Sequence, residues 1–228
     1  MNMLKLLPLE LKRVLQRRFT WLVIALTAFS PVLGLVLYKP ASATTMLSIY
    51  LANPAIAGGA AGGILFGVLT ICEWDRAVRH RVEVLMDAVV SPLSLALVRL
   101  SALMVYALCA FALTLLAWLP ISKGLIGAVF DLSDYALAYL LFMGLALPLG
   151  ILAAAAAYQF CRRADLALLL FAAFAALSLT LWADNWQLCW LNPCVWALSD
   201  DFSNVRIFRS VGYMRLTWLL ALSGVVAG

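Results

Sequence analysis

Charge is the scarcest property of this 228-residue sequence. Only 12% of the residues are Asp, Glu, Lys or Arg, and His80 is the one histidine. Soluble domains carry about 25% charged residues. With 66% hydrophobic residues and a mean hydropathy of +1.03, the composition excludes an ordinary soluble domain and predicts an integral membrane protein.

Sequence signatures of enzymes are also missing. There is no G-x-x-x-x-G-K-[ST] phosphate loop, so the chain is not expected to bind ATP in that way. No His, Cys, Asp and Glu residues have the spacing of a zinc site, and His80 has no Ser or Cys partner in a plausible catalytic arrangement. We therefore expect no enzymatic activity, no metal site and no cofactor bound by this chain.

Ionisable residues are absent from the middle of the long apolar runs. None of these runs carries Asp, Glu, Lys or His at mid-membrane depth, and Arg99 lies near the end of its run, where it can reach the interface. Ion-coupled transporters usually keep such residues inside the bilayer to bind the driving ion. A bundle without buried charge is therefore expected to take its energy from another protein.

Apolar runs fill most of the chain. About 20 helical residues are needed to cross ~30 Å of hydrocarbon. The sequence predicts an all-α, polytopic helical bundle that forms one transmembrane domain over residues 1–228, with six spans at 20–38, 55–72, 96–119, 135–160, 166–183 and 216–228. The last run is too short to cross the bilayer, so we expect this span to be incomplete at Gly228.

The distribution of Lys and Arg predicts the orientation. Of 16 such residues, 11 lie in the N-terminal region, in residues 73–100 or in residues 161–165. Cytoplasmic flanks retain positive charge, so we expect a cytoplasmic N-terminus, in a bacterial cytoplasmic membrane. Topology and contacts with membrane lipid explain the net charge of +5, and no nucleic-acid partner is expected.

Residues 1–18 have the pattern of an amphipathic helix. Leu7, Leu11, Val14 and Leu15 follow a helical spacing, and the opposite face holds Glu10, Lys12, Arg13, Gln16 and Arg17. This pattern predicts a helix in the cytoplasmic headgroup layer. The alternative is a basic flank that only fixes the topology.

Two features of the predicted spans concern helix packing. The second span carries small residues four apart, which predict a close helix–helix or subunit contact at Gly58, Gly59, Gly62, Gly63 and Gly67. Incidental glycines, common in membrane helices, are the alternative. Pro31 and Pro148 lie inside spans, where each removes a backbone hydrogen bond and favours a kink.

Residues 182–215 are predicted to form an extracytoplasmic helical loop. Trp182, Trp186 and Trp190 are four apart, which is typical of an interfacial helix; an aromatic substrate pocket is the alternative. Cys189 and Cys194 flank an Asn-Pro turn. They are expected to form a disulfide or to remain two interfacial thiols.

The segment "CEWDRAVRHRVEVLMDAVVSP", residues 72–92, is an unusually charged connection between spans two and three. If residues 76–90 are helical, one face is apolar and the other polar; the apolar face comprises Val78, Val82, Leu85, Met86 and Val89, and the polar face comprises Arg76, Arg79, His80, Glu83 and Asp87. A plain connector needs far fewer residues. We therefore interpret residues 73–92 as a cytoplasmic element that binds a soluble partner; a surface helix resting on lipid is the alternative.

This arrangement resembles the permease subunits of type-2 ABC exporters. The resemblance rests on Glu73 and Arg76 at the end of span two, on "VEVLMDAVVSPLSLALVRL" with Pro92 and Arg99 at the family's proline and basic positions, and on "LELKRVLQRRFTWLV", which is similar to the family's connecting helix. Leu93-Ser94 replaces the family's Val-Ser, and Val98 replaces a glycine.

The resemblance implies a permease that moves substrate outward, pairs with a second permease copy or homologue, and binds two ATPase subunits that hold ATP and Mg²⁺. It implies that movement of the ATPase enters through Glu73, Arg76, Arg79, Val82, Glu83, Leu85, Met86 and Asp87. It also implies that spans one, two and five line the path between protomers. The alternatives are a non-transporting membrane scaffold or assembly protein, and an ion-coupled secondary transporter.

Overall fold

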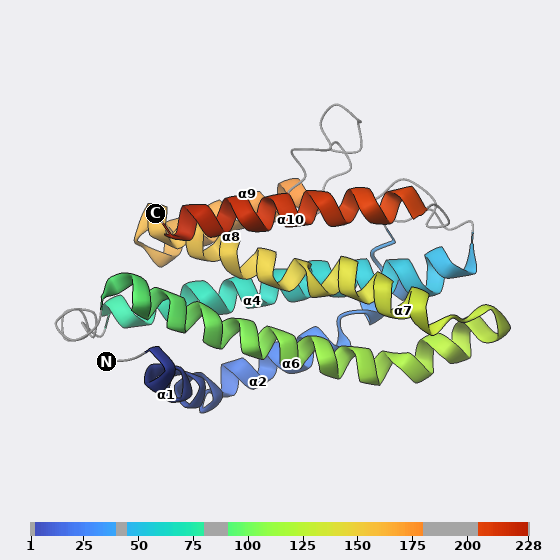
Figure 1. Cartoon of the computed structure of the whole chain (residues 1–228), viewed down its shortest axis with the longest axis horizontal. Coiled ribbons are helices and arrows are strands. Elements are labelled where there is room, and N and C mark those ends of the chain that lie inside the picture. The colour runs from blue at the N-terminus through green and yellow to red at the C-terminus, as the bar shows by residue number, and fades with distance from the viewer. Residues whose placement is uncertain (1–2, 40–44, 80–90, 180–204, 228) are drawn as a thin grey trace.

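The structure, a computed structural model, describes residues 3–39, 45–79, 91–179 and 205–227, and within these ranges every regular element is a helix. Figure 1 shows the helices side by side in one bundle. In chain order they are α1 (Met3–Leu15), α2 (Arg18–Phe29), α3 (Val32–Val36), η1 (Ser48–Ala52), α4 (Asn53–Arg79), α6 (Pro92–Ile126), η2 (Gly127–Val129), α7 (Leu132–Tyr139), η3 (Leu140–Gly144), α8 (Ala146–Cys161), α9 (Ala164–Leu179) and α10 (Val205–Ala227).

Within the described residues, four helical segments are long and apolar enough to cross a membrane, which confirms the all-helical, membrane-protein class. They are Arg18–Val36, Ile49–Arg76, Leu93–Val129 and Leu132–Cys161, close to the first four predicted spans. The apolar helices over Ala164–Ser178 and Val211–Ala227 are shorter. The count of six spans therefore stays a prediction.

Helices α4 and α8 form the centre of the bundle. In the spans that contain α4 and α8, 72% of the most apolar stretch is buried inside the bundle. In the spans that contain α2 and α6, the buried share is 39%. Successive long helices run in opposite directions along the bundle. Helix α1 and the C-terminal end of α10 lie at the same end (Figure 1). We call this the terminal end.

Small residues allow α4 and α8 to approach closely. A Cβ atom at Gly59 would overlap the Phe142 carbonyl, and one at Gly150 would overlap the Gly63 carbonyl. The remaining glycines of this face also contact side chains of the same chain: Gly58 meets Pro31 and Met143, Gly62 meets Leu147 and Thr27, and Gly67 meets Phe171. The glycine face is thus occupied within the chain, and its contact with a second subunit stays a prediction.

Breaks in helix geometry lie next to both prolines for which a kink was predicted, whereas α6 continues through Pro120. Helix α2 ends at Phe29 and α3 begins at Val32, directly after Pro31. The π-helical turn η3 ends at Gly144, four residues before Pro148. Pro148 has no N–H to donate to the Gly144 carbonyl, which explains why the helix departs from α geometry there.

The last helix differs from the prediction. It begins at Val205 rather than near Leu216, and its 23 residues span about 35 Å. Residues 205–215, expected in an outer loop, belong to this helix. Arg215, expected outside the bundle, is fully buried, so the expectation of a bundle without buried charge is wrong. In the sequence, the charge of Arg215 marked the boundary of the predicted span. In the fold, backbone carbonyls of η3 accept hydrogen bonds from its guanidinium.

Replacing Gly59 by alanine is expected to destabilise the fold. The new methyl group would meet backbone atoms, which cannot rotate away as a side chain can, so we expect a loss of about 2 kcal/mol. Thermal unfolding in detergent measures the effect. Gly124→Ala is the matched control, because nothing lies within 4 Å of that position in α6 and alanine favours a helix. Equal melting temperatures for the two variants would contradict the close α4–η3 contact.

Candidate functional site at the terminal end

Helix α1 is fixed against the bundle by apolar and polar contacts. Leu6 and Val14 are buried, and α1 packs on α6. The Tyr106 hydroxyl donates to the Leu11 carbonyl at 2.6 Å, and Thr20 Oγ1 donates to the Val14 carbonyl at 2.8 Å. The predicted N-terminal segment is therefore a helix joined to its own bundle, while its place in the headgroup layer stays a prediction.

Glu73, near the end of α4, is the centre of a charge cluster. Only 3% of its surface is exposed; it accepts a hydrogen bond from Arg17 and forms an ion pair with Arg13. Arg17 Nη1 contacts Oε1, and Arg13 Nη2 lies 3.2 Å from Oε2. A carboxylate in such an apolar setting needs paired cations, and the N-terminal segment supplies both.

Glu10 extends the cluster from α1 to α6. Arg13 Nε donates to Glu10 Oε2 at 2.6 Å, and Arg99 Nε lies 4.0 Å from Oε1. Glu10 was expected on the exposed polar face of the N-terminal helix, but it is buried. That expectation is wrong because Arg99, 89 positions along the sequence, lies opposite it in the fold. We call Glu10, Arg13, Arg17, Glu73 and Arg99 the charge cluster.

Burial and neighbouring charges act on Arg17 in opposite directions. Desolvation lowers the pKa of Arg17, the attraction of Glu73 raises it, and the like charges of Arg76 and Arg13 lower it further. An arginine pKa starts so high that the guanidinium stays protonated throughout the physiological range. Arg17 therefore keeps its positive charge beside Glu73.

Two residues next to Glu73 link α4 to α8. Trp74 packs edge-on against Tyr158, with ring centroids 6.1 Å apart. The Tyr158 hydroxyl donates to Asp75 Oδ1 at 3.5 Å. The end of α4 is therefore tied to α1 through Glu73 and to α8 through Trp74 and Asp75.

The predicted coupling segment follows this cluster directly. Residues 76–79 continue α4 instead of starting a separate helix, and Arg76 is exposed. The remaining predicted coupling residues lie outside the described residues: Val82, Glu83, Leu85, Met86 and Asp87. The same holds for His80, for the three tryptophans Trp182, Trp186 and Trp190, and for Cys189 and Cys194. Through Glu73 and Arg99 the cluster thus links α4 and α6, the two helices that border residues 80–91.

Sequence reasoning singled out Glu73 but missed its partners. Glu10, Arg13 and Arg17 were assigned to a solvated face, and Arg99 was expected to reach the interface by itself. The available signal was the requirement that a carboxylate at the end of an apolar span be paired. The pairing itself depends on which way α1 turns after residue 15, which periodicity does not specify.

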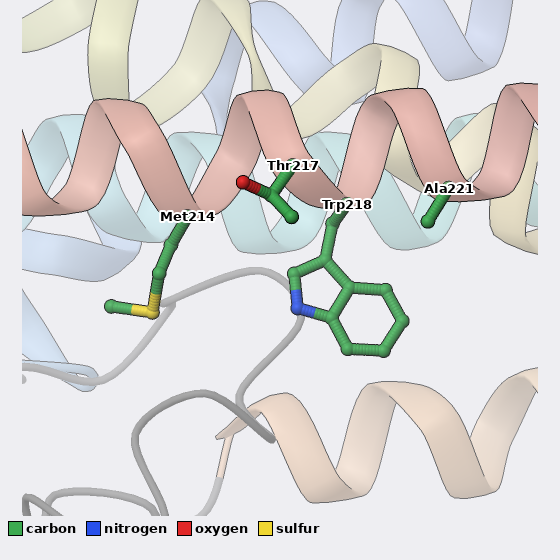
Figure 2. Close-up of a pocket in the computed structure, with 4 residues that line it drawn as sticks. All are labelled: Met214, Thr217, Trp218 and Ala221. Atoms are coloured by element: carbon green, nitrogen blue, oxygen red, sulfur yellow. The ribbon is translucent and has the colours of Figure 1, made fainter.

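A shallow hollow of about 210 Å³ lies on α10 and is lined by Met214, Thr217, Trp218 and Ala221. Figure 2 shows these four side chains on one side of the helix. The lining is apolar apart from Thr217, whose hydroxyl donates to the Tyr213 carbonyl of its own helix. Among the described residues no three His, Cys, Asp or Glu side chains are placed to hold a metal ion.

Glu73→Gln is expected to loosen α1. The change leaves Arg13 and Arg17 without their shared counter-charge. We expect docking of α1 to weaken by roughly 2 kcal/mol, a value between the typical cost of losing an exposed ion pair and that of breaking a buried one. The rate of trypsin cleavage within α1 in detergent reports this. Asp165→Asn is the matched control, because the Arg163–Asp165 pair has side chains 68% and 60% exposed and joins no two helices. Equal cleavage rates in both variants would refute a structural role for the cluster.

Side-chain contacts at the terminal end connect α1, α4, α6 and α8. No family model matches the sequence, and no curated protein and no solved structure matches it.

Proposed function

We propose that this chain is the permease subunit of an ATP-driven exporter of the type-2 ABC class. The observation that carries the proposal is the charge cluster, which joins α1 to the helix ends on both sides of residues 80–91. A partner that pushes on this segment would move three helices together. An isolated connecting loop would give way without moving the bundle.

The packing of α4 supports transmission beyond the terminal end. Helix α4 is buried along most of its length and has glycine–backbone contacts with η3 at Gly59 and with α8 at Gly63. Backbone atoms in direct contact transfer a displacement from one helix to the next, whereas flexible side chains would absorb part of it. A shift at Glu73 is therefore expected to reach η3 and α8.

The charges of the bundle support an external energy source. Arg215 is buried, but a guanidinium stays protonated and repels cations, so it cannot act as a proton carrier or sodium ligand. In this proposal a separate ATPase, present in two copies, binds ATP and Mg²⁺ and docks on residues 76–90. A second permease copy or homologue completes the translocation path.

The proposed orientation places the terminal end in the cytoplasm of a bacterial cell. Several arginines belong to helix ends or connections at the terminal end, as expected of a cytoplasmic flank: Arg13, Arg17, Arg76 and Arg163. Lipid headgroups would surround the same region. The ATPase would then reach residues 76–90 from the side where ATP is available.

Replacement of Val82, Glu83 and Leu85 by alanine is expected to abolish ATPase docking while membrane insertion is preserved. The chain is co-expressed with the product of a neighbouring gene that carries a phosphate-binding loop, purified in detergent that preserves complexes, and assayed for bound ATPase and for ATP hydrolysis. Asp165→Asn serves as the control for a charge change elsewhere at the terminal end.

Unchanged ATPase docking and stimulation in the triple variant would overturn the proposed role of residues 76–90. Absence of any ATPase from the purified wild-type complex would favour the scaffold alternative. Uphill substrate movement by the chain alone in vesicles, driven only by an ion gradient, would establish the secondary transporter instead.

A further inference from the structure

Arg215 is an unusual residue for the interior of this bundle. It lies in α10, its exposed fraction is 0%, and its guanidinium is above the ring of Phe142, with Cζ 5.8 Å from the ring centroid. Arg215 Nη1 donates to the Leu141 carbonyl at 2.5 Å and to the Phe142 carbonyl at 2.8 Å. Both acceptors belong to η3.

The hydrogen bonding of η3 explains why the Leu141 carbonyl accepts from a side chain. In an α-helix the Leu145 N–H would bond the Leu141 carbonyl, four residues back. Here it bonds the Leu140 carbonyl, five residues back, at 3.1 Å. The π-turn thus displaces the Leu141 carbonyl from its usual donor, and Arg215 supplies a charged donor in its place.

The opposite side of η3 is held by α4. The Phe142 carbonyl lies against Gly59, where no side chain intervenes, and Gly212 of α10 approaches the Leu141 side chain, with an ideal Cβ 3.5 Å from Cδ2. The turn is therefore enclosed between the backbone of α4 and the guanidinium of α10. Pro148 removes the N–H that would favour an α-helical closure.

We propose that Arg215 and η3 form a latch that couples docking of α10 to the rotational register of α7. With Arg215 docked, the π-turn is stable because the displaced Leu141 carbonyl is satisfied. When α10 moves away, this carbonyl is most easily satisfied if the segment closes into an α-helix, because the bilayer offers no other donors. Independently of the proposed function, the latch is a two-state element of the fold.

Closure of the turn would rotate α7 relative to α8. Removing the one extra residue of a π-turn turns the preceding helix by roughly 100°. Tyr135 and Tyr139 lie on α7 with ring centroids 4.6 Å apart, and the Tyr135 hydroxyl donates to the Leu115 carbonyl of α6 at 2.8 Å. The rotation would break this bond and turn the tyrosine pair away from α6.

Disulfide cross-linking between Leu141→Cys and Gly212→Cys tests the latch. The native residues Cys72, Cys109, Cys161, Cys189 and Cys194 are first replaced by alanine, and oxidation is carried out in lipid nanodiscs. Arg215→Met removes the donors while keeping an unbranched side chain, and we expect the cross-linking yield to fall by about tenfold. Arg215→Lys, which keeps the charge with a less suitable donor geometry, is expected to give an intermediate yield.

Pro148→Ala tests the coupling from the other side. The new N–H can bond the Gly144 carbonyl and favours α-helical closure, so the yield is expected to fall although Arg215 is intact. Thr217→Val is the control, because that hydroxyl bonds only within α10, and it should cross-link like the parent. Parental yields in Arg215→Met or in Pro148→Ala would overturn the latch. If Arg215→Met does not accumulate, parental yields in Arg215→Lys together with Pro148→Ala overturn it.

Discussion

Glu73 is held by Arg13 and Arg17 because a carboxylate surrounded by an apolar bundle has no water to stabilise its charge. The same constraint governs Arg215, whose charge is satisfied by the carbonyls of Leu141 and Phe142. In both places a group that is expensive to bury is paired with a partner from a distant part of the chain. These pairings join the outer helices to the centre of the bundle.

Helix α4 connects the two pairings. At the terminal end it carries Glu73, and near its other end Gly59 presses on the Phe142 carbonyl that Arg215 also binds. Between them, glycine–backbone contacts leave little room for independent movement of α4 and α8. The end of α4 at Glu73 and the proposed latch at η3 therefore belong to one closely packed part of the bundle.

Several elements of the fold could be predicted from local properties of the sequence. The first four apolar runs are long enough to be helices in any fold, since apolar backbone in a membrane must satisfy its own hydrogen bonds. Pro31 and Pro148 marked two breaks, because a missing N–H weakens the helix locally, although α6 continues through Pro120. The start of α10 was misplaced, because Arg215 looked like an interfacial charge until a buried acceptor for it was known.

The sequence by itself determined that this is a helical membrane protein, where its four long apolar helices run and where their geometry breaks, because length, hydropathy and proline act locally. Only the tertiary structure decided which charges meet. Glu10 faces Arg99, Arg17 reaches Glu73, and Arg215 binds η3, because these partners are brought together by the turn after α1 and by the glycine contacts of α4. Charge partners separated by 56 to 89 positions leave no periodic signal along the chain.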